Sequence, residues 1–237
     1  MSERLRLFPL NTVLFPGATL HLHVFEPRYK QLIAECLDRG EAFGVCLIRE
    51  GDEAGDTEVD PHETGTTAEI AEVVPLPLGR YYVSTIGKRR FRITGVVSRE
   101  PYLLCDVEYL DDERVEGNPI DDLVDRVRAS FDEYNRLLVS YVGADVAVEL
   151  PVDPIEVSYT VGRALQIADL VKQRLLETVE VEQRLRIELE FLRRLLPQLR
   201  SRIERERTLP APARREPLGG EARSHQESYY GKFFSLN

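Results

Sequence analysis

Residues 8–40 decide the fold, and they read FPLNTVLFPGATLHLHVFEPRYKQLIAECLDRG. The segment opens with an apolar strand pattern that runs into Pro16-Gly17, a dipeptide typical of turns. Over residues 20–24 apolar side chains then alternate with His21 and His23, which is the period of a half-buried strand. The stretch therefore predicts a strand, a turn and a second strand before the chain changes to a helical pattern.

A helix is expected directly after the second strand. Pro27 suits the first helical turn, where its missing N–H costs nothing, and Gly40 suits a left-handed C-cap. Apolar residues spaced for one helix face lie between them: Tyr29, Leu32, Ile33, Cys36 and Leu37. So short a helix is marginal alone, and we expect its apolar face to pack on the preceding strands.

Six short motifs along the chain, in this order and spacing, resemble the Lon amino-terminal domain family: FPL, LFPG, FEPRY, FGVCLI, GTTAEI and GKRRFRI. The resemblance covers roughly residues 5–200. It implies the PUA-like substrate-binding fold found at the front of Lon proteases and as stand-alone bacterial proteins. It also implies a role in recognising polypeptides, without naming the ligand.

Residues 1–117 are predicted to form a small β-barrel with one inserted helix. Further strands are expected at residues 43–47, 66–74, 81–86, 91–97 and 102–110, with turn signals between them, including Gly87-Lys88. Closing the sheet removes the edges of such a meander, so a barrel is the economical arrangement. The acidic segment over residues 50–65 is predicted to be a surface loop without a metal site.

Residues 118–206 are predicted to form an α-helical bundle subdomain, which gives an α+β fold overall. Asn118 and Pro119 form a helix start, and the period changes there from 2 to 3.6. Asp153 begins a capping-box spacing, and helix breaks are expected near Asp169 and Thr178. Pro197 should kink the last helix or end its first half.

Residues 207–237 form a third region, predicted to be a flexible tail with an aromatic end. Pro, Gly and charged residues dominate its first part, which is typical of disorder. Its last residues carry Tyr229, Tyr230, Phe233 and Phe234. One hypothesis is that these rings dock into a groove of the same molecule or of a neighbour, giving self-association. The alternative is that the tail stays free.

Composition indicates a cytoplasmic protein. The 237-residue chain carries a formal net charge of −10, which argues against general affinity for nucleic acid or anionic membranes. It contains neither an apolar run long enough to span a bilayer nor the h-region of a signal peptide. Three widely spaced cysteines in apolar patterns predict buried free thiols: Cys36, Cys46 and Cys105.

The search for catalytic chemistry predicts no enzyme, no metal site and no cofactor. The P-loop pattern needs a glycine where Tyr82 stands relative to Gly87-Lys88, and the G-x-S-x-G elbow does not occur. His21 and His23 share a strand face but lack further zinc ligands nearby. Because the chain ends soon after the resembling region, we expect the ATPase and peptidase domains of Lon to be missing.

Two charged clusters invite a binding interpretation. Lys88, Arg89, Arg90 and Arg92 could form an RNA patch, but a solvated strand face paired with acidic residues is favoured. In the FEPRY run, Glu26 is expected to pair with Arg28 or with an arginine of the RRFR strand. The functional alternative is that Arg28, Tyr29 and Lys30 contact a bound polypeptide.

Two functions from different classes therefore stay open. The first is a non-catalytic module that recognises exposed, unfolded segments of other polypeptides through apolar surface near the barrel–helix junction. The second is a small-ligand sensor or enzyme that uses a cleft at that junction, with RNA binding as a further, less favoured alternative. Binding of unfolded proteins without turnover would favour the first function.

Overall fold

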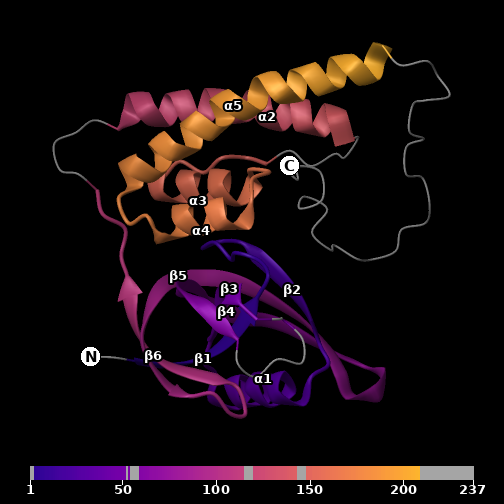
Figure 1. The fold of residues 1–237 in the computed structure, drawn as a ribbon, viewed down its shortest axis with the longest axis vertical. Coiled ribbons are helices and arrows are strands. Elements are labelled where there is room, and N and C mark those ends of the chain that lie inside the picture. Colours follow the sequence, from indigo (N-terminus) through magenta and orange to yellow (C-terminus); the bar gives the residue numbers. More distant parts are fainter. Residues whose placement is uncertain (1–2, 52, 54–58, 115–119, 143–147, 209–237) are drawn as a thin grey trace. The chain divides into compact units, whose positions relative to one another are not determined.

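A computed structural model describes residues 3–51, 53, 59–114, 120–142 and 148–208. The chain divides into two compact units. The first consists of the described residues of Met1–Glu113 together with Gly162–Val179, and the second of those in Arg114–Val161 and Glu180–Gln226. Figure 1 shows the elements of each unit along the colour ramp. The tail prediction, with Tyr229, Tyr230, Phe233 and Phe234, lies outside the described residues, as does the start at Asn118 and Pro119.

The first unit is built on six strands: β1 (Glu3–Leu10), β2 (Thr19–Val24), β3 (Phe43–Glu50), β4 (Asp60–Leu76), β5 (Arg80–Ser98) and β6 (Leu103–Leu110). They form one sheet in the order β2-β5-β4-β3-β1-β6, and β5 also pairs with β6. That last pairing closes β5, β4, β3, β1 and β6 into a ring, as the sequence predicts. The β1–β3 pair is parallel and all the other pairs are antiparallel.

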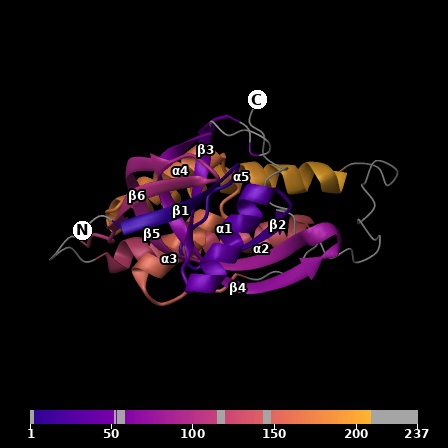
Figure 2. The ribbon, with the colours of Figure 1, turned by 90° about the horizontal axis from the view of Figure 1, so that it is seen from below.

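Helix α1 (Pro27–Arg39) confirms the prediction for the opening segment. Pro27 is its first residue, and Gly40 ends it with a φ of 65°. Tyr29, Leu32, Ile33 and Cys36 are buried in a core that also holds residues of β1, β2, β3, β4 and β5, whereas Leu37 is 49% exposed. Figures 1 and 2 show α1 lying beside β2 and the long β4–β5 hairpin.

Two predictions are wrong because each expected a turn or loop where the structure has a continuous strand. Residues 81–86 and 91–97 belong to a single strand, β5, and Gly87 is buried inside it. A Cβ at Gly87 would lie 2.4 Å from the carbonyl oxygen of Phe15, so this glycine permits a close approach rather than a turn. Likewise, β4 starts at Asp60, inside the segment predicted as an acidic loop.

The helices confirm the predicted breaks: α2 (Asp121–Val142), α3 (Pro154–Ala164), α4 (Asp169–Glu177) and α5 (Val181–Thr208). Asp153 caps α3, because its Oδ1 accepts the N–H groups of Ile155 (2.7 Å) and Glu156 (3.4 Å). In the second unit α2 packs against α5. Helix α5 runs through Pro197, so the helix does not end there.

Helix α4 groups with the strands rather than with the other helices, which differs from the boundary predicted at residue 117. It packs against β4, and the Nε2 of Gln173 donates to the carbonyl oxygen of Thr64 at 2.9 Å. The unit boundary therefore falls inside α3, after Val161. Hydrogen bonds to buried side chains, rather than a change of hydrophobic period, decide where this helix belongs.

Candidate functional site

One part of the sheet is open on a face that carries aromatic side chains. Beyond Ala68, β4 pairs only with β5, and β2 also pairs only with β5. These three segments form a three-stranded extension of the barrel, which we call the arm: residues 19–24, 69–76 and 80–86. The inner face of the arm holds Leu22, Val24 and Val83, which are buried in the same core as α1. Its other face is the candidate site.

Strand register identifies the side chains on this outer face. His23 of β2 and Val74 of β4 both pair with Tyr82 of β5, so the three side chains form one row across the arm. In the next row His21 pairs with Ser84, and its Nδ1 lies 3.1 Å from the serine Oγ. The rings of His21 and Tyr82 are nearly parallel, and their centroids are 5.6 Å apart.

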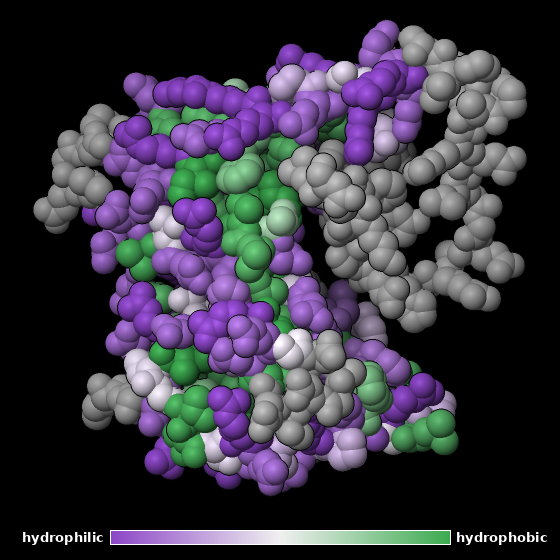
Figure 3. All heavy atoms as spheres, in the orientation of Figure 1, coloured by the Kyte–Doolittle hydropathy of each residue, from purple (hydrophilic) through white to green (hydrophobic). Residues whose placement is uncertain are grey.

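The row continues into exposed apolar groups at the end of the arm. Phe25 follows β2 on the same face, 50% exposed, with its ring 5.8 Å from that of His23. Val74 is 39% exposed, and Leu78, at the tip of the hairpin, is 88% exposed. Figure 3 shows hydrophobic residues, drawn in green, at the outer end of this hairpin. Large apolar side chains gathered at one surface are characteristic of interaction sites.

The three predicted contact residues of the FEPRY run have different environments. Lys30 is half-buried, and its Nζ lies 3.8 Å from the position that a Cβ at Gly79 would take, so it lies beside the hairpin tip. Tyr29 is buried, with its ring stacked on Phe8 at 3.8 Å between centroids. The structure therefore brings Lys30 to the arm and places the Tyr29 ring in the core.

Arg28 has a local structural role. Its Nε donates to Glu26 at 2.9 Å, which confirms the predicted pairing at the junction between β2 and α1. Its guanidinium also lies 4.5 Å from the centre of the Tyr29 ring. The side chain is only 16% exposed. These contacts fix the start of α1, and a direct contribution of Arg28 to polypeptide binding stays a prediction.

The basic cluster of β5 is the predicted solvated face at three of its four positions, and the prediction is wrong for Arg90, which is buried. Its Nη1 donates to the carbonyl oxygens of Leu176 (2.8 Å) and Thr178 (2.9 Å), and its Nη2 donates to Asp112 (3.0 Å). Arg90 thereby caps the C-terminal end of α4. The other three members each lie near a surface carboxylate: Lys88 near Glu69, Arg89 near Asp111 and Arg92 near Glu108.

The cysteines are buried free thiols, as predicted. Burial raises the pKa of the Cys36 and Cys105 thiols to about 11, and it raises that of Cys46 further. Thiols of this kind are poor nucleophiles at neutral pH. Within the described ranges, no three His, Cys, Asp or Glu side chains gather as a metal-binding group. No described helix is long and apolar enough to cross a membrane.

Comparison with known proteins identifies the family. Residues 4–194 match the model of the ATP-dependent protease La (LON) substrate-binding domain. The chain belongs to the Lon substrate-binding domain family. It is 27% identical over 202 residues to the Lon protease of Anaeromyxobacter dehalogenans and 28% identical over 218 residues to Lon protease 2 of Sorangium cellulosum. These matches cover 80% and 86% of this chain.

The curated relatives are much longer than the matched region. The chain spans 23% of the Anaeromyxobacter protein and 26% of the Sorangium protein. A Lon N-terminal domain protein from Xanthomonas campestris, solved as a crystal structure, aligns with a TM-score of 0.59 and 28% identity over 78% of this chain and 95% of that one. The N-terminal domain of a Mycobacterium avium complex Lon protease shares the fold, with a TM-score of 0.55 and 19% identity over 80% of this chain and 98% of that one.

Sequence reasoning missed most of the arm within this Lon-family fold. The signal was present, because Phe25 follows His21 and His23 at the same two-residue spacing and so belongs to their face. A second signal was the apolar hairpin tip, PLPLG, over residues 75–79. Neither signal shows that the face stays open, since that depends on which strands pair.

Proposed function

We propose that this protein is a non-catalytic module that recognises polypeptides and that the outer face of the arm is its binding surface. The family supports a substrate-recognition role, since its model describes the substrate-binding part of an ATP-dependent protease. The half-buried Tyr82 and the exposed side chains around it support this location: Phe25, His23, Val74 and Leu78. Apolar and aromatic surface suits segments that unfolded proteins expose and folded proteins bury.

The arm offers two physical means of binding an extended chain. Covering one large apolar side chain contributes roughly 1.5–3 kcal/mol, so contacts with Phe25, Val74 and Leu78 could offset the ordering of a short client segment. In addition, both margins of the arm are unpaired in the described part of the sheet, and an edge strand can pair with the backbone of an extended peptide. Backbone pairing does not depend on sequence, which suits a receptor for many clients.

The observation that carries this proposal is the half-exposed ring of Phe25. The exposed half of this ring contributes nothing to burial in the fold, but a bound polypeptide could cover it. We expect Phe25→Ser to weaken binding of a reduced, unfolded model protein by about tenfold, the equivalent of roughly 1.4 kcal/mol. Fluorescence anisotropy of a labelled client, titrated with the full chain, measures this affinity.

Val96→Ser is the matched control, because Val96 is 52% exposed on β5 but lies outside the arm. It should leave the affinity unchanged. Equal affinities for the native chain, Phe25→Ser and Val96→Ser would contradict a binding site on the arm. Turnover of ATP or peptide that copurifies with the chain and disappears on a single substitution would contradict the non-catalytic role.

A further inference from the structure

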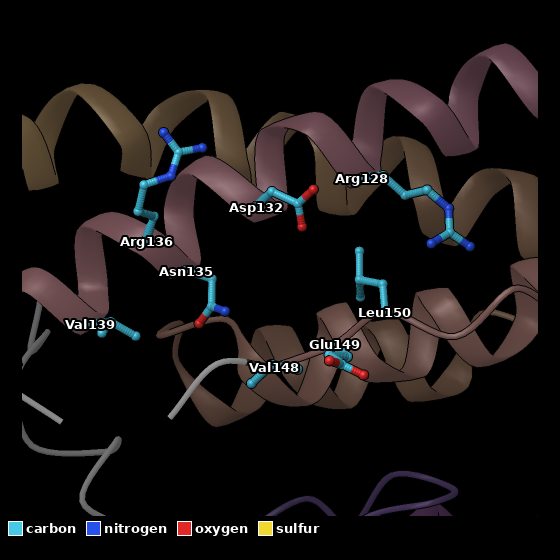
Figure 4. A pocket seen from close by; sticks show the side chains of 8 residues that line it. All are labelled: Arg128, Asp132, Asn135, Arg136, Val139, Val148, Glu149 and Leu150. Atoms are coloured by element: carbon cyan, nitrogen blue, oxygen red, sulfur yellow. The ribbon is translucent and has the colours of Figure 1, made fainter. Parts of the chain in front are cut away.

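The second unit contains a pocket that has no part in the arm. Its volume is about 630 Å³, within the range of sites that hold small ligands or short peptide segments. One wall is a stripe of α2, and the other is the chain segment 148–150. The lining residues are Arg128, Asp132, Asn135, Arg136, Val139, Val148, Glu149 and Leu150. Figure 4 shows Asn135 pointing down from α2 and Leu150 pointing up from the opposite segment.

The pocket presents hydrogen-bonding groups that match those of a peptide backbone. The side-chain amide of Asn135 carries a donor and an acceptor, and it forms no hydrogen bond within the described part of the chain. The backbone of residues 148–150 likewise forms none there, and these residues lie outside any helix or strand. Together they can pair with the N–H and C=O groups of an extended segment.

Charge decides which side chains such a segment should carry. Arg128 is engaged by the protein itself, because its Nη2 donates to the carbonyl oxygens of Pro151 and Val152. The guanidinium of Arg136 points away from the gap (Figure 4). By contrast, Asp132 and Glu149 line the pocket and form no ion pair among the described residues. The four charged side chains of the lining balance in formal charge. Since Arg136 and the Glu149 carboxylate both point away from the gap (Figure 4), Asp132 is the carboxylate that a ligand can reach, and it favours a cationic group.

We infer that this pocket binds a short extended polypeptide segment in which an apolar residue adjoins a lysine or arginine. The apolar side chain lies against Val139, Val148 and Leu150, which are all half-buried. The basic side chain lies near Asp132, and Asn135, one helical turn further along α2, pairs with the peptide backbone. This inference shares its ligand class with the proposed function and rests on it to that extent, but the site is separate from the arm.

The test is a backbone-amide NMR titration of the full chain with the blocked peptide acetyl-Ala-Leu-Lys-Ala-amide. We expect the amide signals of Val148, Glu149 and Leu150 to shift, and the same peptide with glutamate in place of lysine to shift them less. Asp132→Asn should weaken binding about two- to fivefold, as expected for a partly exposed ion pair. Asp125→Asn, at an exposed position of α2 outside the pocket, should leave the affinity unchanged.

Two results would overturn this inference. One is the absence of shifts at residues 148–150 up to peptide concentrations of about 10 mM, which is weaker than the affinities typical of specific recognition. The other is an equal effect of Asp132→Asn and Asp125→Asn. Phe25→Ser separates the two sites, because it should leave the pocket shifts intact. Pocket shifts that persist while client binding is unaffected by Phe25→Ser would contradict only the arm.

Discussion

At the scale of single residues, Arg90 shows how a buried cation organises this family member. Its guanidinium is 1% exposed and donates to two carbonyl oxygens near the end of α4 and to the Asp112 carboxylate. The sequence predicts the same exposed position for Arg90 and Arg92, because the two arginines lie two residues apart on one strand and so share a face. The strand period cannot show that α4 packs over one of them.

We predict that Arg90→Ala lowers the free energy of unfolding by about 3–5 kcal/mol, because it removes a buried guanidinium together with the hydrogen bonds that it donates to two carbonyl oxygens and to the half-buried Asp112 carboxylate. Arg92→Ala is the control. Its side chain is 45% exposed and lies 3.4 Å from Glu108, so the change should cost no more than about 1 kcal/mol. Urea unfolding midpoints measure both. Similar midpoints for the two variants would contradict the capping role of Arg90.

Glu188 is a second residue whose environment the sequence does not reveal. The side chain is fully buried in α5, and neither carboxyl oxygen has a hydrogen-bond partner among the described residues. Burial raises the pKa of Glu188 well above its usual range, against the opposing effect of the Arg184 charge. The folded protein therefore holds a proton on this group that the unfolded chain releases above about pH 4.3.

This proton makes stability fall as pH rises. At pH values between the pKa of Glu188 in the unfolded chain and its pKa in the folded protein, the folded state binds one more proton than the unfolded state. Each pH unit of increase in this range therefore lowers the free energy of unfolding by up to about 1.4 kcal/mol. We predict that Glu188→Gln is more stable than the native chain at pH 7 and loses less stability between about pH 5 and pH 8. Glu190→Gln, on the exposed side of α5, should keep the native pH dependence. A less stable Glu188→Gln would instead indicate a charged carboxylate that Arg184 stabilises.

At the scale of elements, the continuity of β5 depends on Gly87. The strand pairs with β2 along its first part and with β6 along its second, and Gly87 lies between these parts. We predict that Gly87→Ala costs about 1–3 kcal/mol, because the new methyl group would press on the Phe15 carbonyl. Gly95→Ala in the same strand, where the built Cβ meets nothing within 4 Å, should be close to neutral. Thermal unfolding distinguishes them, and a neutral Gly87→Ala would contradict the close approach.

Elements could be predicted from the sequence wherever local chemistry decides them. Pro27 and Gly40 bound α1 and Asp153 caps α3, because proline geometry, left-handed glycine and capping carboxylates act over a few residues. The acidic segment is a strand from Asp60 onward, because pairing with β3 overrides the polar composition that predicts a loop there. Gly87 could not be assigned from the sequence, because a turn and a close backbone contact both require glycine.

At the scale of the whole molecule, the ordered motifs identified the family, but the candidate site needed the strand pairing. Lys30 reaches the hairpin tip through tertiary structure, and Tyr29, its neighbour in the same motif, points into the core. Phe25 and Val74 are far apart in sequence and come to the same face of the arm because β2 and β4 both pair with β5. No sequence period encodes that pairing.

The most direct test of the arm as a polypeptide-binding surface is a map of where an unfolded client touches the full chain. Backbone-amide NMR with a reduced, unfolded model protein provides this map. We predict shifts at residues 21–25, 72–78 and 80–84, and we expect Phe25→Ser to need about a tenfold higher client concentration to reach half of the same shifts. Shifts confined to other residues, or none at a client concentration of about 1 mM, where even weak specific binding saturates, would contradict the account.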